Sequence, residues 1–256
     1  MMPPSYPAAN RNTDVNEFMK PLLIISHVAC SRPGYLCEYL DRHRLPYQRF
    51  SIESGEPLPS PDRLSGLVLL GAPVSVNSDQ AWIEQEIRLV RDCAERNIPV
   101  FGICFGGQLI SKAFGGEVFT ASTMQIGWHP VTITEQGRQL FNGNPMPAQF
   151  TAFEWHEDTF TLPAGAVPLF SGGCIGNQGF LYRGCLAVQF HPEVTEEIVR
   201  EWVARYEACV DNPTLCRQDH NAILQDLPQK LTAMRQMSDN LFDWWLKQVN
   251  PTHNPR

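Results

Sequence analysis

One cysteine in a glycine-rich stretch has the setting of a reactive thiol. Cys104 follows the apolar run Val100–Ile103, which predicts a buried strand, and precedes Phe105–Phe114, which predicts a short helix closed by glycines. A side chain on such a turn is pushed away from the backbone, and Gly102 and Gly106 leave it uncrowded. The helix N-terminus also favours thiolate over thiol. The pattern predicts a nucleophile, with a buried structural cysteine as the alternative, since free cysteines are among the most buried residues.

A cysteine nucleophile needs a base, and two histidines are candidates. His191 follows the predicted strand Leu186–Phe190, and residues two apart in an extended segment share a face, so Glu193 can orient its imidazole. A solvated turn is the alternative. His156, in Glu154-Trp-His-Glu-Asp158, contacts the substrate or is a hydrogen-bonded loop residue. Only His191 is expected to have a carboxylate placed to orient it, so we assign the base to His191.

The elements that must position these residues alternate between strand and helix in the first half of the chain. This alternation predicts an α/β fold, a doubly wound and mostly parallel central sheet with helices on both faces. The clearest helix is Trp82–Glu95, with its apolar residues on one stripe and the pair Glu84 and Arg88 outside it. The other expected elements are the strands Leu22–Ser26, Tyr47–Ile52 and Leu67–Leu70 and the helix Tyr35–Arg42.

After Gly116 the pattern changes to short strands separated by turn residues, which predicts a small antiparallel extension of the sheet. Thr195 can cap a helix over Glu196–Cys209, and a second apolar stripe predicts a C-terminal helical tail over Leu227–Val249. The expected strands are Trp128–Thr134, Gln149–Phe153, Val167–Ser171, Phe180–Tyr182 and Leu186–Phe190.

Three segments are expected: a flexible N-terminal arm over residues 1–20, the main domain over 21–210, and a helical extension over 211–256 packed on that domain. Trp244 and Trp245 are adjacent in the tail and point about 100° apart, so both can be buried only if the helix is covered on more than one side. The tail either packs into its own domain or waits for a partner, and we expect the first.

Composition limits the function classes. The formal net charge is −7 and Lys and Arg do not cluster, so neither nucleic acid nor membrane partners are expected. Apolar residues make up 43% of the chain, yet no run is long enough to span a membrane. The eight cysteines include no Cys-x-x-Cys pair, so no metal site is expected and we predict reduced thiols in a cytoplasmic protein.

Together these motifs resemble the class I glutamine amidotransferases, most closely stand-alone homologues of the glutaminase domain of GMP synthetase. The likeness covers about Leu22 to Tyr206 and includes Gly71-Ala-Pro73, Ile126-Gly-Trp128 and Trp155-His-Glu-Asp158. It implies a catalytic triad in the chain order Cys, His, Glu. In α/β-hydrolases, by contrast, the acid precedes the histidine in the chain. The residues it assigns to the triad are Cys104, His191 and Glu193.

The resemblance also implies an oxyanion hole formed by the backbone N–H groups of Ala72 and Phe105. It places five residues at the substrate, namely Gly71, Gln108, Trp128, His156 and Asp158. Two departures bear on substrate fit: Ala72 stands where relatives commonly have glycine, and Gln125 where they often have glutamate.

The implied reaction is hydrolysis of the side-chain amide of glutamine through a γ-glutamyl thioester, with no cofactor. A γ-glutamyl peptide or amide hydrolase with the same triad is the alternative, and a non-catalytic binding protein is a third reading. The chain has no Gly-x-x-x-x-Gly-Lys phosphate loop, so a synthetase that accepts the ammonia would be a separate partner. We expect a self-sufficient hydrolase that needs no such partner.

Overall fold

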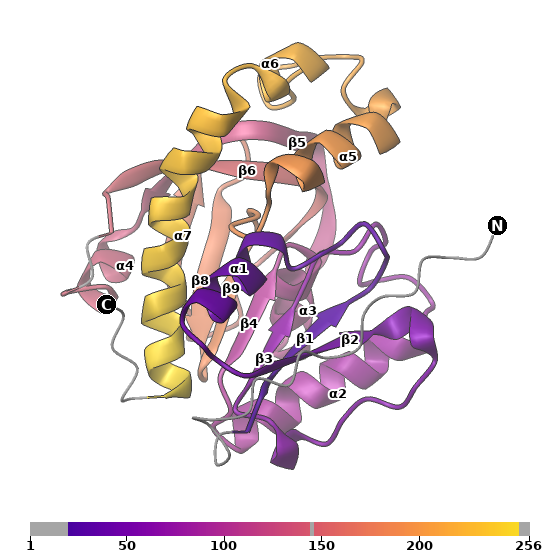
Figure 1. The fold of residues 1–256 in the computed structure, drawn as a ribbon, viewed down its shortest axis with the longest axis vertical. Coiled ribbons are helices and arrows are strands. Elements are labelled where there is room, and N and C mark those ends of the chain that lie inside the picture. Colours follow the sequence, from indigo (N-terminus) through magenta and orange to yellow (C-terminus); the bar gives the residue numbers. More distant parts are fainter. Residues whose placement is uncertain (1–19, 144–145, 251–256) are drawn as a thin grey trace.

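The computed structural model describes residues 20–143 and 146–250, which build one nine-stranded sheet with helices on both faces (Figure 1). The strand order is β2-β1-β3-β4-β9-β8-β7-β5-β6. The expected N-terminal arm lies outside the described residues except for Lys20, and so do residues 251–256 of the expected extension. In the described part of the chain no helix is both long and apolar enough to cross a membrane.

Five parallel strands form the first half of the sheet, and their apolar side chains alternate between two buried faces. Leu22 and Ile24 of β1 point to one core, whereas Leu23 and Ile25 point to the other. Helices α1, α5 and α7 cover the first face, and α2 and α3 cover the second. The parallel strands are β1 (Leu22–Ser26), β2 (Tyr47–Ser51), β3 (Gly66–Leu69), β4 (Val100–Ile103) and β9 (Cys185–Val188).

The helices between these strands are α1 (Gly34–Arg42), α2 (Ala81–Glu95) and α3 (Phe105–Ala113), with short 3-10 turns at Ile52–Ser54 and Pro61–Arg63. Strands β1 to β4 and their helices agree with the predicted doubly wound arrangement, because continuous apolar runs and amphipathic stripes are strong local signals. The prediction is wrong for β9, because the strand expected over Leu186–Phe190 was assigned to the antiparallel extension and instead pairs in parallel with β4.

The antiparallel half is built around one long hairpin. Its arms, β5 (Val118–Ile133) and β6 (Gln149–Phe160), are about twice as long as the predicted strands, with a register shift between Thr120 and Gln125. β7 (Val167–Gly172) and β8 (Asn177–Tyr182) connect the hairpin to β9. The short helix α4 (Glu135–Leu140), capped by the hydroxyl of Thr134, was not predicted, since it has too few residues to show a periodic pattern.

The C-terminal helices lie on the sheet. Thr195 caps α5 (Glu196–Arg205) as expected, and a 3-10 turn (Glu207–Cys209) and α6 (His220–Leu224) lead to α7 (Leu227–Val249). The long α7 crosses one face of the sheet (yellow in Figure 1). Trp245 packs against Phe101 of β4, and Trp244 packs edge-on against Phe141 beside α4. Both tryptophans are buried because α7 is covered on two sides.

A disulfide joins Cys174, in the turn between β7 and β8, to Cys216. The prediction of reduced thiols is therefore wrong for these two residues. Their separation of 42 residues gave no local signal, and the fold brings them together because the segment around Cys216 pairs with Ile126 of β5. Cys30, Cys37, Cys93, Cys104, Cys185 and Cys209 are free.

Replacing Cys216 by Ser should lower the free energy of unfolding by about 2–4 kcal/mol, because the cross-link restricts the unfolded chain. Denaturant unfolding of the oxidised protein measures this, with Cys209→Ser as the matched control for a free thiol. A reducing agent should remove the difference between wild type and Cys216→Ser. Equal stability of the two oxidised proteins would contradict a structural role for this cross-link.

Candidate active site

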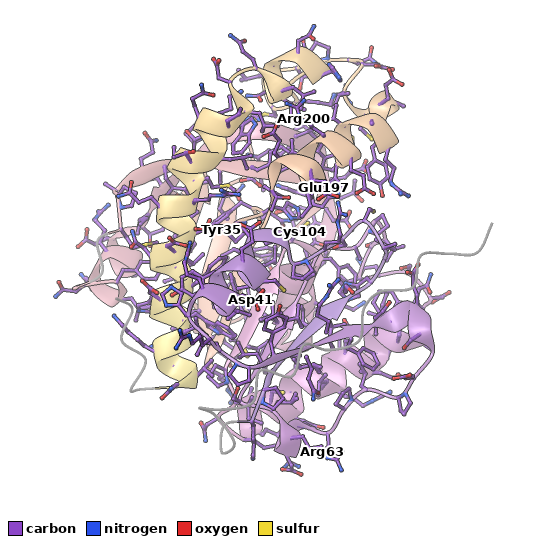
Figure 2. All side chains as sticks on the ribbon, in the orientation of Figure 1. Tyr35, Asp41, Arg63, Cys104, Glu197 and Arg200 are labelled. Atoms are coloured by element: carbon purple, nitrogen blue, oxygen red, sulfur yellow. A yellow bond between two sulfur atoms is a disulfide. The ribbon has the colours of Figure 1, made fainter. Side chains whose placement is uncertain are left out.

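Cys104 lies near the middle of the molecule, on the turn between β4 and α3, below the helix that carries Glu197 and Arg200 (Figure 2). Its backbone has φ 53° and ψ −107°, a conformation that residues other than glycine rarely adopt. The turn is tight enough that a Cβ on Gly102 would lie 2.4 Å from the backbone of Gly106. A Cβ on Gly106 would lie 2.3 Å from the carbonyl oxygen of Leu69. Glycine is therefore required on both sides of the cysteine.

Two groups contact the Cys104 sulfur. The side-chain Nε2 of Gln189 donates to Sγ over 3.6 Å, and in the thiol form Sγ donates to the carbonyl oxygen of Trp155 over 3.9 Å. The backbone N–H of Cys104 donates to Val188 of the neighbouring strand β9. The sulfur is thus held in place between a side-chain donor and a backbone acceptor.

His191 and Glu193 form a buried pair at the end of β9. His191 Nδ1 donates to Glu193 Oε1 over 2.8 Å, and both side chains are 2% exposed. His191 Nε2 is buried and has no hydrogen-bond partner within the described chain. Burial acts to lower the pKa of His191, but the charges of Glu193 and of Cys104 raise that pKa well above its ordinary value. The ring therefore has Nδ1 fixed by Glu193, while Nε2 has no hydrogen-bond partner among the described residues.

Three elements hold the His-Pro-Glu segment. The N–H of His191 donates to Phe153 of β6, and the hydroxyl of the buried Ser238 on α7 donates to the carbonyl of Pro192. The N–H of Tyr35 donates to the carbonyl of Glu193. Helix α7, the predicted tail, therefore supports the candidate site directly.

The expectation that only His191 has an orienting carboxylate is wrong. His156 Nε2 lies 3.1 Å from Glu154, and His27 Nε2 lies 3.1 Å from both oxygens of Glu86. Long-range packing, which no sequence pattern reveals, creates the His27 pair. The three histidines differ in the second ring nitrogen, because those of His27 and His156 face carbonyl oxygens, whereas that of His191 is free. Only His191 can exchange a proton with a substrate without breaking a hydrogen bond.

The peptide between Gly71 and Ala72 is fixed from behind. The carbonyl oxygen of Gly71 accepts a hydrogen bond from the hydroxyl of Ser31 at 2.6 Å and lies 3.2 Å from Nδ1 of His27. A Cβ on Gly71 would lie 3.2 Å from His191 Cε1 and 3.8 Å from Cys104 Cβ, so this peptide borders the thiol. Glu86 holds His27 from α2, and the sequence signal for this role is a carboxylate among the buried apolar residues of that helix.

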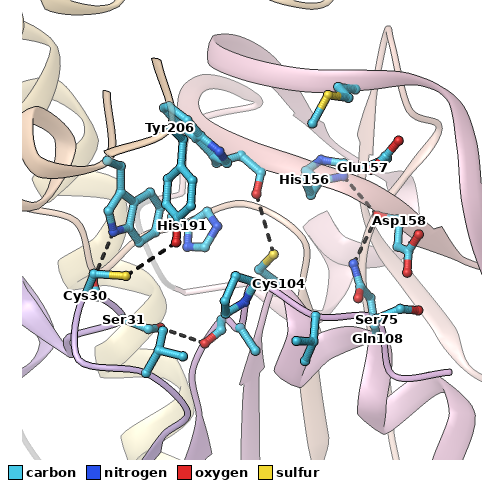
Figure 3. Close-up of a pocket in the computed structure, with 18 of the residues that line it drawn as sticks. Cys30, Ser31, Ser75, Cys104, Gln108, His156, Glu157, Asp158, His191 and Tyr206 are labelled. Carbon is cyan, nitrogen blue, oxygen red and sulfur yellow. Dashed lines mark hydrogen bonds between the residues drawn. The ribbon is translucent and has the colours of Figure 1, made fainter. Parts of the chain in front are cut away.

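A cavity of about 390 Å³ surrounds Cys104 (Figure 3). Of the predicted substrate residues, Gly71, Gln108, His156 and Asp158 line it, together with Ala72 of the predicted oxyanion hole. Trp128 does not line it, because its ring packs against Phe153 and its Nε1 donates to Ile223. Several further side chains that line the cavity come from distant segments and carry no sequence signal, namely Cys30, Ser31, Met124, Trp202 and Tyr206.

Gln108 and Asp158 connect two elements at this cavity. Gln108 Nε2 donates to the carbonyl of Asp158 over 3.0 Å, which ties α3 to β6, while the Asp158 carboxylate accepts from Thr120. Gln108 thus shapes the cavity wall. Among the described residues, no group of three or more His, Cys, Asp and Glu side chains is placed to hold a metal ion.

Comparison with known proteins identifies the family. The family model described as "Glutamine amidotransferase class-I" matches residues 40–202, more than half of the chain. The chain belongs to the class I glutamine amidotransferases. A glutamine-hydrolyzing GMP synthase subunit from Methanococcus maripaludis is 31% identical over 146 residues, which is 55% of this amidotransferase and 70% of that protein.

Gamma-glutamyl peptidase 3 of Arabidopsis thaliana is 29% identical over 150 residues, covering 56% of this amidotransferase and 60% of the peptidase. Matches to longer GMP synthases cover only 24% to 28% of their length. The crystal structure of a glutamine amido transferase from Methylobacillus flagellatus superposes with a TM-score of 0.85 at 28% identity, covering 93% of this chain and all of that one. The likeness to a solved structure therefore extends well beyond the matched family segment.

Replacing Glu193 by Gln should lower the pKa of His191, because the carboxylate charge contributes to raising it. In the wild-type protein, protonated His191 stabilises the fold fully below about pH 6.5, the ordinary pKa of histidine in an unfolded chain. This stabilisation is lost as pH rises through the raised pKa of His191 in the folded protein. The stability difference between wild type and Glu193→Gln should therefore shrink with rising pH. Imidazole proton NMR and denaturant unfolding at several pH values measure both effects. The exposed Glu207→Gln is the control, and an unchanged His191 titration would contradict the pairing.

The free cysteines should differ sharply in reactivity. Burial raises the pKa of Cys37 to about 11 and the pKa values of Cys93 and Cys185 to about 12, so these remain unreactive thiols at neutral pH. A glutamine-like electrophile should label Cys104 first, as peptide mapping by mass spectrometry can establish. Faster labelling of any other cysteine would contradict the assignment.

Proposed function

We propose that this protein hydrolyses γ-glutamyl amides, glutamine included, with Cys104 as nucleophile, His191 as general base and acid, and Glu193 as the residue that orients His191. The observation that carries the proposal is the unpaired Nε2 of His191 beside the thiol, with Nδ1 held by Glu193 at 2.8 Å. The geometry favours this pair over His156, whose two nitrogens are both engaged.

The reaction has two halves. The Cys104 sulfur attacks the amide carbon as its proton passes to His191, and the C–N bond breaks when His191 returns a proton to the leaving nitrogen. Ammonia or an amine leaves, and a γ-glutamyl thioester remains on the sulfur. His191 then takes a proton from water, whose oxygen attacks the thioester, and glutamate and the thiol are released.

The backbone N–H groups of Ala72 and Phe105 are proposed to bind the oxyanion. In a trans peptide the N–H points opposite the carbonyl, so anchoring the Gly71 oxygen on Ser31 and His27 turns the Ala72 N–H away from them. Phe105 is the first residue of α3, where the N–H has no partner within the helix. An alanine is suitable at position 72 because the donor is a backbone group.

Asp158 and Glu157 are proposed to bind the α-amino group of the substrate. Both line the cavity, and among the described residues no Lys or Arg lines it, so this region favours a cation. Asp158 and Cys104 both line this cavity, so an ammonium next to Asp158 would direct the side chain that carries the γ-amide toward Cys104 (Figure 3).

Two relatives suggest different fates for the ammonia or amine that is released. One is named as a subunit of GMP synthase, which suggests ammonia transfer to a synthetase partner, and the other is named as a γ-glutamyl peptidase, which suggests hydrolysis alone. We propose the second for this chain, because both tryptophans of α7 are already covered by its own domain. The expected cytoplasmic location stays a prediction, and the Cys174–Cys216 disulfide weighs against a strongly reducing compartment.

His191→Asn should lower kcat on glutamine by at least about 10²-fold, the usual contribution of a general acid-base group. His156→Asn should change mainly KM, because His156 lines the cavity with both nitrogens engaged. Steady-state release of ammonia or amine by the pure protein, on glutamine and on γ-glutamyl compounds, measures both. The opposite order of effects would show that the base is misassigned. Negligible wild-type turnover on every compound, restored by cell extract, would point to a partner-gated glutaminase.

Glu86→Gln tests the support behind Gly71. It should lower kcat about tenfold with little change in KM, because the Ala72 donor acts on the oxyanion rather than on bound substrate. Glu84→Gln, an exposed position on the same helix, is the matched control and should leave kcat unchanged. If Glu86→Gln raised KM and spared kcat, the positioning role would be refuted.

A further inference from the structure

The cavity has two chemically different ends, with Cys104 between them (Figure 3). At one end lie the carboxylates of Asp158 and Glu157 and nearby hydroxyl groups. At the other end the wall is aromatic, and we call this the aromatic end. Its rings come from β6, from α5 and from the residue that follows α5, and they belong to Trp155, Trp202 and Tyr206.

The aromatic end lies on the side of His191. The ring centroids of His191 and Trp202 are 4.8 Å apart in a T-shaped contact. In the proposed reaction His191 gives its proton to the leaving nitrogen, so the leaving group must depart on the side of this ring. The acidic end then holds the glutamyl part of the substrate, and the aromatic end faces the leaving group.

The aromatic wall is a fixed structure. Trp202 Nε1 donates to the carbonyl of Cys30 over 2.9 Å, and the Tyr206 hydroxyl lies 3.6 Å from the Cys30 sulfur. The Trp155 ring centroid is 6.1 Å from those of both Trp202 and Tyr206. Burial raises the pKa of Tyr206 to about 12, so its phenol is neutral. Within the described residues, His191 is the one titratable side chain besides cysteine and this tyrosine that lines this end.

The size of the cavity exceeds what glutamine requires. Its volume of about 390 Å³ lies within the range of sites that hold drug-sized ligands, whereas glutamine has ten non-hydrogen atoms. If ammonia were the leaving group, the aromatic wall would remain exposed to water. Covering this wall with an apolar group instead lowers the free energy, because apolar surface is removed from water. The wall is therefore matched to a hydrocarbon substituent on the amide nitrogen.

We propose that the aromatic end is a leaving-group subsite for an uncharged apolar amine, so that the preferred substrates are γ-glutamyl amides of apolar or aromatic amines rather than glutamine itself. The inference rests on the proposed function and specifies its substrate class. A leaving group that carries a carboxylate, such as an amino acid, would lose its hydration against the rings of the aromatic end, where no Lys or Arg of the described chain lines the cavity. The bond broken is the amide C–N bond, and the amine departs with the proton from His191.

The test compares kcat/KM of the wild-type protein on four compounds: glutamine, γ-glutamylmethylamide, γ-glutamylbenzylamide and γ-glutamylglycine. Methylamine and benzylamine are both alkylamines, so the comparison isolates the apolar group from amide reactivity. Burial of the phenyl ring should favour the benzylamide over the methylamide by at least about tenfold. The glycine compound should be the poorest of the three substituted amides.

Tyr206→Ala then removes part of the wall without touching Cys104, His191 or Glu193. It should lower the benzylamide to methylamide ratio of kcat/KM about fivefold or more. Tyr182→Ala, a half-buried tyrosine of β8 that does not line the cavity, is the matched control and should keep the wild-type ratio. If Tyr206→Ala does not fold, the wild-type ratio decides.

The outcomes separate the two proposals. Turnover of glutamine and the methylamide without a preference for the benzylamide, or a preference for γ-glutamylglycine, would overturn the subsite and leave the proposed hydrolase intact. An unchanged ratio in folded Tyr206→Ala would also overturn it. Absence of turnover on all four compounds would instead refute the proposed function.

Discussion

The close approach of three backbone segments at Cys104 is the constraint on which the site depends. The β4–α3 turn can bring the thiol to the cavity only because Gly106 lies against Leu69 of β3 without a side chain between them. The resulting backbone at Cys104, with φ 53°, costs about 1–3 kcal/mol and persists because the surrounding sheet determines it. The parallel half of the fold is thus the scaffold that holds the backbone of Cys104 in an unfavourable conformation and places its sulfur at the cavity.

The antiparallel half and the C-terminal helices complete the surroundings of this sulfur. β6 provides the carbonyl of Trp155 and the backbone contact for His191, and α7 fixes the segment through Ser238. Ser238 thus holds the backbone of Pro192, the residue between His191 and Glu193, from 46 residues later in the chain. The helical extension functions as part of the site's support.

Sequence patterns predicted β1 to β4 and their helices nearly to the residue, because most of these strands are apolar runs and the helices are amphipathic. They did not show that β9 joins the parallel strands, because strand direction depends on the tertiary structure. The spacing of two residues in an extended segment placed Glu193 beside His191, whereas Cys104 was joined to that pair only by the resemblance to a known family. Sequence patterns could not reveal the partners of His27, since Glu86 lies 59 residues away, nor the Cys174–Cys216 pair, since both depend on the tertiary structure. Trp128 was misplaced because an aromatic residue in a strand shows nothing of which face it occupies when both faces are covered.

The proposed mechanism requires that Cys104 form a covalent γ-glutamyl intermediate without a partner protein. The most direct measurement is mass spectrometry of the pure protein after acid quenching during turnover of a γ-glutamyl amide. We predict a γ-glutamyl adduct on the peptide that contains Cys104, absent from Cys104→Ala and removed by hydroxylamine as expected for a thioester. Release of glutamate by a protein that carries no such adduct, and equal release by Cys104→Ala, would contradict the mechanism.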